Sequence, residues 1–159
     1  MTNVIIKGPL LTQSGYGVHS RQIFRWADSR GYNISCILTP WGITPWYIDR
    51  LECNGLIEKI MNATAQITKT PDLSIQIQLP NEWDPNLAKK NIGVTAGVET
   101  NICSPTWVEC CKKMDKVIVP TTFTANTFKT SGFENCTVIP ETFHDSCLET
   151  NYQEIKNVK

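Results

Sequence analysis

The stretch from residue 4 to residue 38, VIIKGPLLTQSGYGVHSRQIFRWADSRGYNISCIL, carries the pattern of a complete strand–helix–strand unit. The continuous apolar run Val4–Ile6 predicts a buried strand, which a Gly-Pro pair ends. Residues 18–30 have apolar side chains at helical spacing, and Gly31 stands where a left-handed C-terminal cap belongs. A second apolar run, 34–38, follows. The stretch therefore predicts two parallel strands joined by a helix.

The rest of the chain continues this alternation of strands and helices. Residues 48–65 predict a helix that is interrupted near Asn54 and Gly55, and a later helix should begin at Pro105 after the cap residue Ser104. Four further apolar runs predict strands: 73–79, 92–98, 116–119 and 137–139. Such alternation predicts an α/β protein with a Rossmann-like open, mostly parallel sheet of about six strands and helices on both faces.

The length of 159 residues is that of one domain. We expect residues 1–142 to form this Rossmann-like domain, and the polar residues 143–159 to be a linker or a C-terminal surface helix. Fifteen basic and fifteen acidic side chains cancel, which argues against binding nucleic acid or an anionic membrane through charge. No apolar run approaches the ~20 residues that cross a bilayer, so we expect no transmembrane segment.

The seven cysteines indicate reduced thiols and no metal site. No two of them form a C-x-x-C pair, and neither His19 nor His144 stands at zinc-finger spacing from a cysteine. The N-terminus lacks the features of a signal peptide. We therefore expect a cytoplasmic protein in which Cys36 and Cys136, inside apolar runs, are small core residues.

The segments after the strands are the candidate functional site. Parallel strands bring their carboxyl ends to one edge of a sheet, and open α/β sheets bind ligands at that edge. Gly15 and Gly17 precede a predicted helix, whose free amides favour a phosphate-sized anion. The dinucleotide fingerprint needs a third glycine, where the chain has Ser20, so we exclude a dinucleotide site. The six residues expected along this edge are Gly15, Trp41, Glu82, Glu99, Thr121 and Glu141.

Each of these residues also has a purely structural interpretation. Trp41 either stacks on a sugar or covers the end of the core. Glu99, a carboxylate at the tip of a central strand, is either a functional group or an ordinary exposed glutamate. Thr121 needs no role beyond capping a helix, and His19 is either a proton carrier or a hydrogen-bonded structural residue.

The order of several short motifs resembles that of a known enzyme family. The motifs are Ser14–Gly17 with Ser20–Arg21, Val94–Thr100, Pro105–Trp107, Met114–Thr121, Ser131–Phe133 and Val138–Pro140. Over residues 3 to about 142, the chain resembles the N-terminal half of GT-B glycosyltransferases of the family-4 type (glycosyl transferases group 1). These enzymes transfer a sugar from a nucleotide-sugar to an acceptor.

The resemblance implies roles for residues of this chain. It implies that the donor diphosphate faces Gly15, Tyr16 and Gly17. The catalytic candidates, Glu99 and His19, follow from their own chemistry and position. We expect no cofactor, because the nucleotide-sugar would be a substrate, and no metal, as the cysteine spacing indicates. On the acceptor side the resemblance implies Glu99, Thr100 and Thr121, to which the aromatic and carboxylate side chains after two other strands add Trp41 and Glu82.

The first functional hypothesis is therefore the acceptor-side domain of a retaining hexosyltransferase. Its partners would be a nucleotide-sugar, a carbohydrate or glycolipid acceptor, and either a C-terminal nucleotide-binding domain or a second copy of the chain. Without such a second domain we expect no activity. The alternative is a stand-alone carbohydrate-binding or interaction module with a degenerate glycosyltransferase fold. A flavin-binding or response-regulator-like domain is disfavoured, because no acidic cluster follows the first strand.

Overall fold

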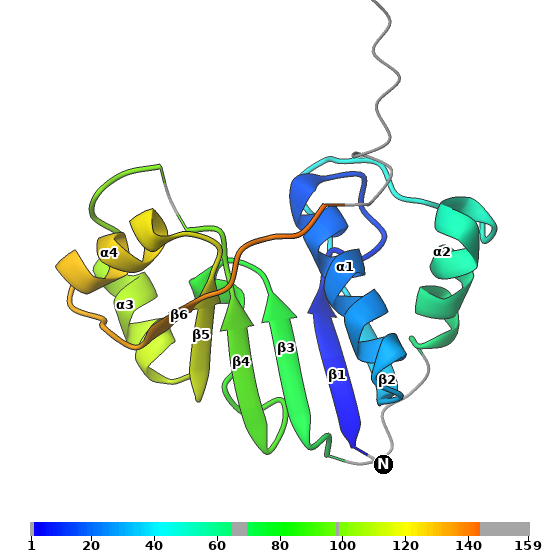
Figure 1. Cartoon of the computed structure of the whole chain (residues 1–159), viewed down its shortest axis with the longest axis horizontal. Coiled ribbons are helices and arrows are strands. Elements are labelled where there is room, and N and C mark those ends of the chain that lie inside the picture. The colour runs from blue at the N-terminus through cyan, green and yellow to red at the C-terminus, as the bar shows by residue number, and fades with distance from the viewer. Residues whose placement is uncertain (1, 65–69, 98, 144–159) are drawn as a thin grey trace, which may run out of the picture.

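The structure is a computed structural model, and it describes residues 2–64, 70–97 and 99–143. In these residues strands and helices alternate along the chain (Figure 1). The strands are β1 (Asn3–Gly8), β2 (Asn33–Leu38), β3 (Leu73–Ile77), β4 (Lys90–Val94), β5 (Lys116–Val119) and β6 (Cys136–Val138). The helices are α1 (Gly15–Ser29), α2 (Glu52–Asn62), α3 (Pro105–Lys112) and α4 (Thr122–Thr130), with a 3₁₀ turn, η1, at Pro80–Glu82.

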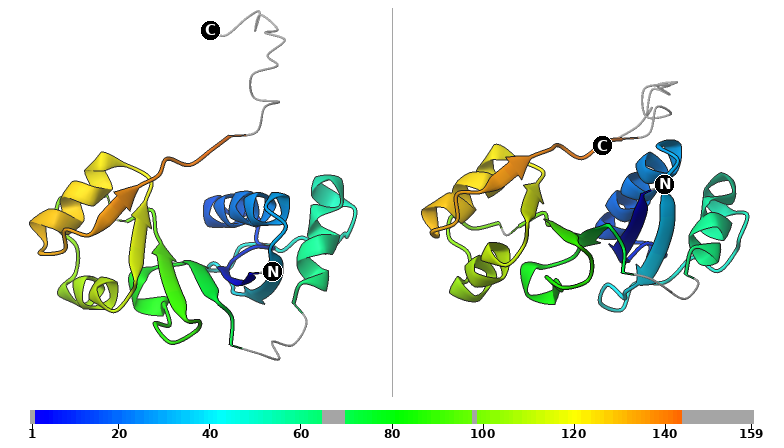
Figure 2. Two further views of the ribbon diagram at one scale, coloured as in Figure 1. Left: turned by 60° about the horizontal axis from the view of Figure 1, so that its bottom comes forward. Right: turned by 90° about the horizontal axis from the view of Figure 1, so that it is seen from below.

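The strands form one open sheet in the order β2-β1-β3-β4-β5-β6, and all neighbouring strands are parallel. α1 packs on the face of the sheet that carries Val4, Ile6 and Ile75. Val117 and Val119 point to the opposite face, where α3 and α4 cover them. The views in Figure 2 show α1 and α2 at the β1–β2 end of the sheet, and α3 and α4 at the β5–β6 end. The predicted Rossmann-like α/β sheet is confirmed.

The sheet carries two separate hydrophobic cores. The first core joins α1 and α2 to β1–β3 and includes Phe24, Ile57 and Ile75. The second joins α3 and α4 to β5 and includes Cys111 and Phe128. The predicted core positions of the two cysteines are confirmed, because Cys36 is buried in the first core and Cys136 packs against the second.

α1 begins three residues earlier than the sequence predicts. The Ser14 side chain accepts a hydrogen bond from the Gly17 amide at 3.0 Å, so Ser14 is the N-cap and the glycines form the first turn. Gly17 is buried there, and a Cβ on it would stand 2.2 Å from the Thr12 carbonyl oxygen. A Cβ on Gly15 would meet nothing within 4 Å. The two glycines therefore differ, because only Gly17 is required by packing.

The predicted interruption of the second helix is confirmed. Cys53, Asn54 and Gly55 have φ angles of 54°, 59° and 76°, which are left-handed. Regular helix follows them, and at its far end the Ala63 carbonyl accepts a hydrogen bond from the Cys36 amide at 2.7 Å. α2 therefore lies beside β2 at the edge of the sheet.

β3 is buried on both faces, although apolar and polar residues alternate along it. Its polar side chains make internal hydrogen bonds. Ser74 donates to Asn91 Oδ1 at 2.8 Å, and Gln76 exchanges hydrogen bonds with the backbone of Asp84. Burying a polar group is tolerated when it is hydrogen-bonded, and the pattern of residue types alone does not reveal such partners.

β4 ends at Val94, not at the predicted Val98. The chain turns at Gly97, whose φ of +87° is a conformation that suits glycine. The predicted linker or helix at 143–159 falls almost entirely on residues 144–159, which lie outside the described residues.

The two glycines at the start of α1 form a matched pair for a stability test. Gly17→Ala should lower the free energy of unfolding by about 1–3 kcal/mol or more, because the new methyl group overlaps backbone. Gly15→Ala should leave it within about 0.5 kcal/mol or raise it slightly. Urea denaturation of both variants measures the difference. Equal stabilities would show that Thr12 is not held against the helix.

Candidate functional site

A cavity of ≈ 180 Å³ lies at the carboxyl edge of the sheet. Its walls are the first two turns of α1, the ends of β3, β4 and β5, and the segment that follows β6. The order of the strands reverses between β1 and β3, and open α/β sheets bind ligands beside such a reversal. The polar residues of its lining are Tyr16, His19, Thr95 and Glu141.

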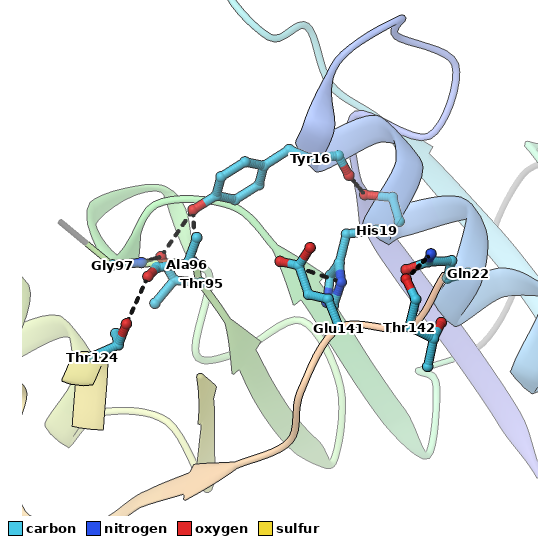
Figure 3. Close-up of polar contacts among 10 residues, drawn as sticks. Tyr16, His19, Gln22, Thr95, Ala96, Gly97, Thr124, Glu141 and Thr142 are labelled. Carbon is cyan, nitrogen blue, oxygen red and sulfur yellow. Dashed lines mark hydrogen bonds and ion pairs between the residues drawn. The ribbon is translucent and has the colours of Figure 1, made fainter. Parts of the chain in front are cut away.

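Tyr16 joins α1 to the end of β4 (Figure 3). Its hydroxyl lies 3.2 Å from Thr95 Oγ1 and accepts a hydrogen bond from the Ala96 amide at 3.0 Å. Its ring stacks on Trp41, with centroids 3.9 Å apart and an interplanar angle of 17°. Burial raises the pKa of the Tyr16 hydroxyl above its usual value, so this side chain is a neutral hydrogen-bonding group.

The backbone after β4 is held from its other side by α4. Thr124 donates a hydrogen bond to the Ala96 carbonyl at 3.0 Å. A Cβ on Gly97 would stand 2.4 Å from Thr124 Cγ2, so only glycine allows this approach. The wall of the cavity at residues 95–97 is thereby fixed by two helices, which gives the site a defined shape.

His19 and Glu141 face each other across the cavity. His19 Nδ1 lies 3.6 Å from Glu141 Oε1, which is too long for a hydrogen bond. Nδ1 is buried and has no hydrogen-bond partner among the described residues. Burial lowers the pKa of His19, while the Glu141 carboxylate raises it; burial has the larger effect. The imidazole is therefore held neutral near pH 7, beside a carboxylate that can stabilise its protonated form.

The start of α1 lies at the cavity, which Gly15 and Tyr16 line. Ser14 satisfies the Gly17 amide, and its carbonyl accepts from Val18. Within the described residues, the amides of Gly15 and Tyr16 have no recorded acceptor. Free amides at a helix N-terminus favour an anion, and the bare Cα of Gly15 leaves room for one to approach.

Four of the predicted site residues have structural partners. Gly17 packs against the carbonyl of Thr12. Glu82 accepts from the Leu79 amide at 3.0 Å within η1, and Thr121 caps α4 by accepting from the Thr124 amide at 3.0 Å. Thr100 donates to the Ile102 carbonyl at 2.7 Å. None of the four lines the cavity.

Glu99 lies on the loop between β4 and α3. Its side chain is exposed, it has no hydrogen bond or ion pair with another described residue, and it does not line the cavity. Trp41 reaches the cavity only through its stacking on Tyr16. Of the residues predicted for this edge or site, the structure thus brings together Gly15, Tyr16, His19 and Glu141.

Sequence reasoning left Thr95 and Ala96 out of the site. They were assigned to a strand that runs to Val98, and the glycine at position 97 was the signal that the strand ends earlier. Glu141 was expected at this edge without a chemical role. Its distance to His19 depends on the path of the chain after β6, which no local pattern reveals.

Comparisons of the chain with models of protein families, with curated proteins and with solved structures find no match. No helix among the described residues is long and apolar enough to span a membrane. In the same part of the chain, His, Cys, Asp and Glu side chains do not gather in groups of three that could bind a metal ion.

The lowered pKa of His19 should make stability depend on pH. The unfolded chain takes up a proton near the ordinary pKa of 6.5, whereas the folded chain takes it up only at lower pH. The contribution of His19 to the free energy of unfolding should be constant above pH 6.5. Below pH 6.5 the free energy of unfolding should decrease, by at most about 1.4 kcal/mol per pH unit. Thermal melts between pH 8 and 5 test this.

Two variants separate the contribution of His19 from that of other groups. His19→Gln should flatten the pH dependence below 6.5. Glu141→Gln should extend the loss of stability to lower pH, since it removes the carboxylate that raises the pKa of His19. A wild-type slope that survives in His19→Gln would contradict the assignment.

Glu99→Gln should change the free energy of unfolding by less than ~0.5 kcal/mol, as expected for an exposed side chain without partners. Asp115→Asn is the contrasting variant. Asp115 accepts hydrogen bonds from the Asn91 amide and from Lys90, so its replacement should lower the melting temperature measurably. If Glu99→Gln is the more damaging change, Glu99 belongs to the scaffold.

Proposed function

We propose that this chain is the acceptor-side domain of a glycosyltransferase that transfers a hexose from a nucleotide-sugar to an acceptor. The observation that carries the proposal is the cavity at the carboxyl edge. It combines amide donors at the start of α1 with a neutral histidine and a carboxylate, His19 and Glu141. Amide donors at a helix N-terminus suit a phosphate. A neutral histidine beside a carboxylate suits a hydroxyl group that loses a proton.

The small volume of the cavity supports the interpretation that it is one half of a cleft between two domains. Pockets for whole ligands have volumes of about 300–1,000 Å³. The ≈ 180 Å³ cavity suits part of a nucleotide-sugar and its acceptor, with the remainder held by another domain. This agrees with the two-domain enzymes that the sequence resembles, in which a C-terminal domain binds the nucleotide.

The residues of this chain would act as follows. The amides of Gly15 and Tyr16 bind the donor diphosphate. His19 lines the cavity and, being neutral, accepts the proton of the acceptor hydroxyl. The acceptor oxygen bonds to the anomeric carbon on the face from which the diphosphate leaves, as the bond between that carbon and the diphosphate oxygen breaks and the nucleoside diphosphate is released. Glu141 stabilises the imidazolium that forms, and Trp41, held against Tyr16, offers an aromatic surface beside the site. Stereochemical retention is implied by the family resemblance.

One observation favours the alternative of a binding or interaction module. The loop between β2 and α2 exposes large aliphatic side chains, among them Ile43, Ile48 and Leu51. Exposed apolar groups that lie close together mark interaction surfaces. Such a module would bind a sugar or a partner and would have no use for the proton acceptor His19.

The test is calorimetric titration of the chain with several nucleotide-sugars and free sugars. We expect at least one of these ligands to bind. Gly15→Ala should lower the affinity for a nucleotide-sugar at least about tenfold, because the new methyl group blocks the amides. Val18→Ala, on the exposed side of α1, is the control and should bind normally. The chain alone should transfer no sugar, because half a cleft does not hold donor and acceptor in register.

Two results would overturn this proposal. One is the absence of binding to every nucleotide-sugar and sugar. The other is rapid sugar transfer by the purified chain, which would contradict the half-cleft. If sugars bind equally well to wild type and His19→Gln, and adding a nucleotide-binding domain restores no transfer, the binding module is the better description.

A further inference from the structure

A second and larger cavity, of ≈ 390 Å³, lies along the face of the sheet that carries α1. We call it the apolar groove. Its floor is formed by side chains of β3, β4 and β5, including Ile75, Ile92 and Ile118. One wall is α1, with Ile23 and Trp26, and the other is the segment 139–142. Figure 1 shows this segment crossing in front of the sheet from β6 toward α1.

The groove exists because α1 covers only part of this face. α1 packs over β1, β2 and β3, whereas no described helix packs on the same face of β4 and β5. The side chains of Ile92 and Ile118 are only partly buried there. At the far wall, Gln22 donates a hydrogen bond to the Thr142 carbonyl, which holds the segment against α1 (Figure 3).

The chemistry of the lining indicates which kind of ligand the groove can bind. In the part of the chain that the structure describes, the side chains with polar atoms in the lining are His19, Gln22, Thr142 and the indole of Trp26, and Gln22 is already engaged with the backbone of Thr142. An extended peptide would leave its backbone N–H and C=O groups without partners in such a groove. An aliphatic chain has no polar groups to satisfy.

The groove is continuous with the cavity at the carboxyl edge. Four residues line both: His19, Val94, Ile118 and Ile139. A ligand with an apolar tail in the groove therefore has its polar end among the amides of α1, His19 and Glu141. A single ligand would therefore contact the apolar surface of the groove at one end and the polar groups of the cavity at the other.

We propose that the apolar groove binds the aliphatic chain of an amphiphilic acceptor, whose polar head lies in the carboxyl-edge cavity. The identity of the head as a sugar or another hydroxyl group rests on the proposed function. The binding of the aliphatic chain does not, because it follows from the groove alone.

The test is a calorimetric series with glucose and with n-hexyl, n-octyl and n-decyl β-D-glucoside, all below the concentrations at which they form micelles. Affinity should rise about fourfold for each methylene group until the groove is filled. The chain length at which it stops rising measures the occupied length of the groove. Equal affinity for glucose and all three glucosides would overturn the inference and leave the proposed function intact.

Two matched variants locate the binding. Ile139→Ser changes a groove residue that is 50% exposed, and Ile102→Ser changes a residue that is 61% exposed on the loop before α3. Ile139→Ser should lower the affinity for n-octyl glucoside about fivefold, and Ile102→Ser should leave this affinity unchanged. Circular dichroism verifies that both fold. Equal weakening by the two changes would mean nonspecific binding and would overturn the inference.

Three further measurements distinguish other occupants. If 1-octanol binds as tightly as n-octyl glucoside, the groove is confirmed as an aliphatic site while the sugar site of the proposed function fails. If glucosides bind only after residues 144–159 are removed, the groove belongs to the chain's own C-terminal residues, and the inference is overturned. It is also overturned if sedimentation shows a dimer that Ile139→Ser dissociates, since a second copy then fills the groove.

Discussion

The hydrogen bonds and packing between residues 9–14 and the first turns of α1 determine where Gly15, Tyr16 and His19 lie in the site. The buried guanidinium of Arg21 donates to the carbonyls of Leu10 and Thr12 at 2.8 and 2.9 Å, and its cationic carbon lies 4.9 Å from the centre of the Tyr47 ring. Gly17 allows the helix to approach the same loop. Because the loop is held so closely, Gly15, Tyr16 and His19 of α1 line one cavity together with the ends of β3, β4 and β5.

The fold was predictable because its signals are local and repeated. Continuous apolar strands, caps such as Ser104 and Thr121, and glycines after the helices each specify one boundary, and together they specify a parallel sheet. The edge rule also groups Gly15, Tyr16 and His19, and all three line the cavity. The sequence could not predict that packing requires glycine at position 17 and not at position 15, because this difference depends on a loop that folds back onto the helix.

The second half of the site depends on contacts between distant parts of the chain. Glu141 reaches His19 only because the segment after β6 returns across the sheet to α1, more than 100 residues away in sequence. The same return path forms one wall of the apolar groove. A single feature, the incomplete covering of one face of the sheet, thus places an aliphatic surface next to the polar edge.

A sheet shared by two separate cores can open from one end. The core of α3, α4 and β5 shares no buried residue with that of α1 and α2, so hydrogen exchange at its amides can proceed by a partial opening that leaves β1–β3 folded. The backbone at Ala96, held by Tyr16 on one side and Thr124 on the other, bridges the two halves at the cavity. A ligand in that cavity touches both halves, so its binding slows local opening as well as global unfolding.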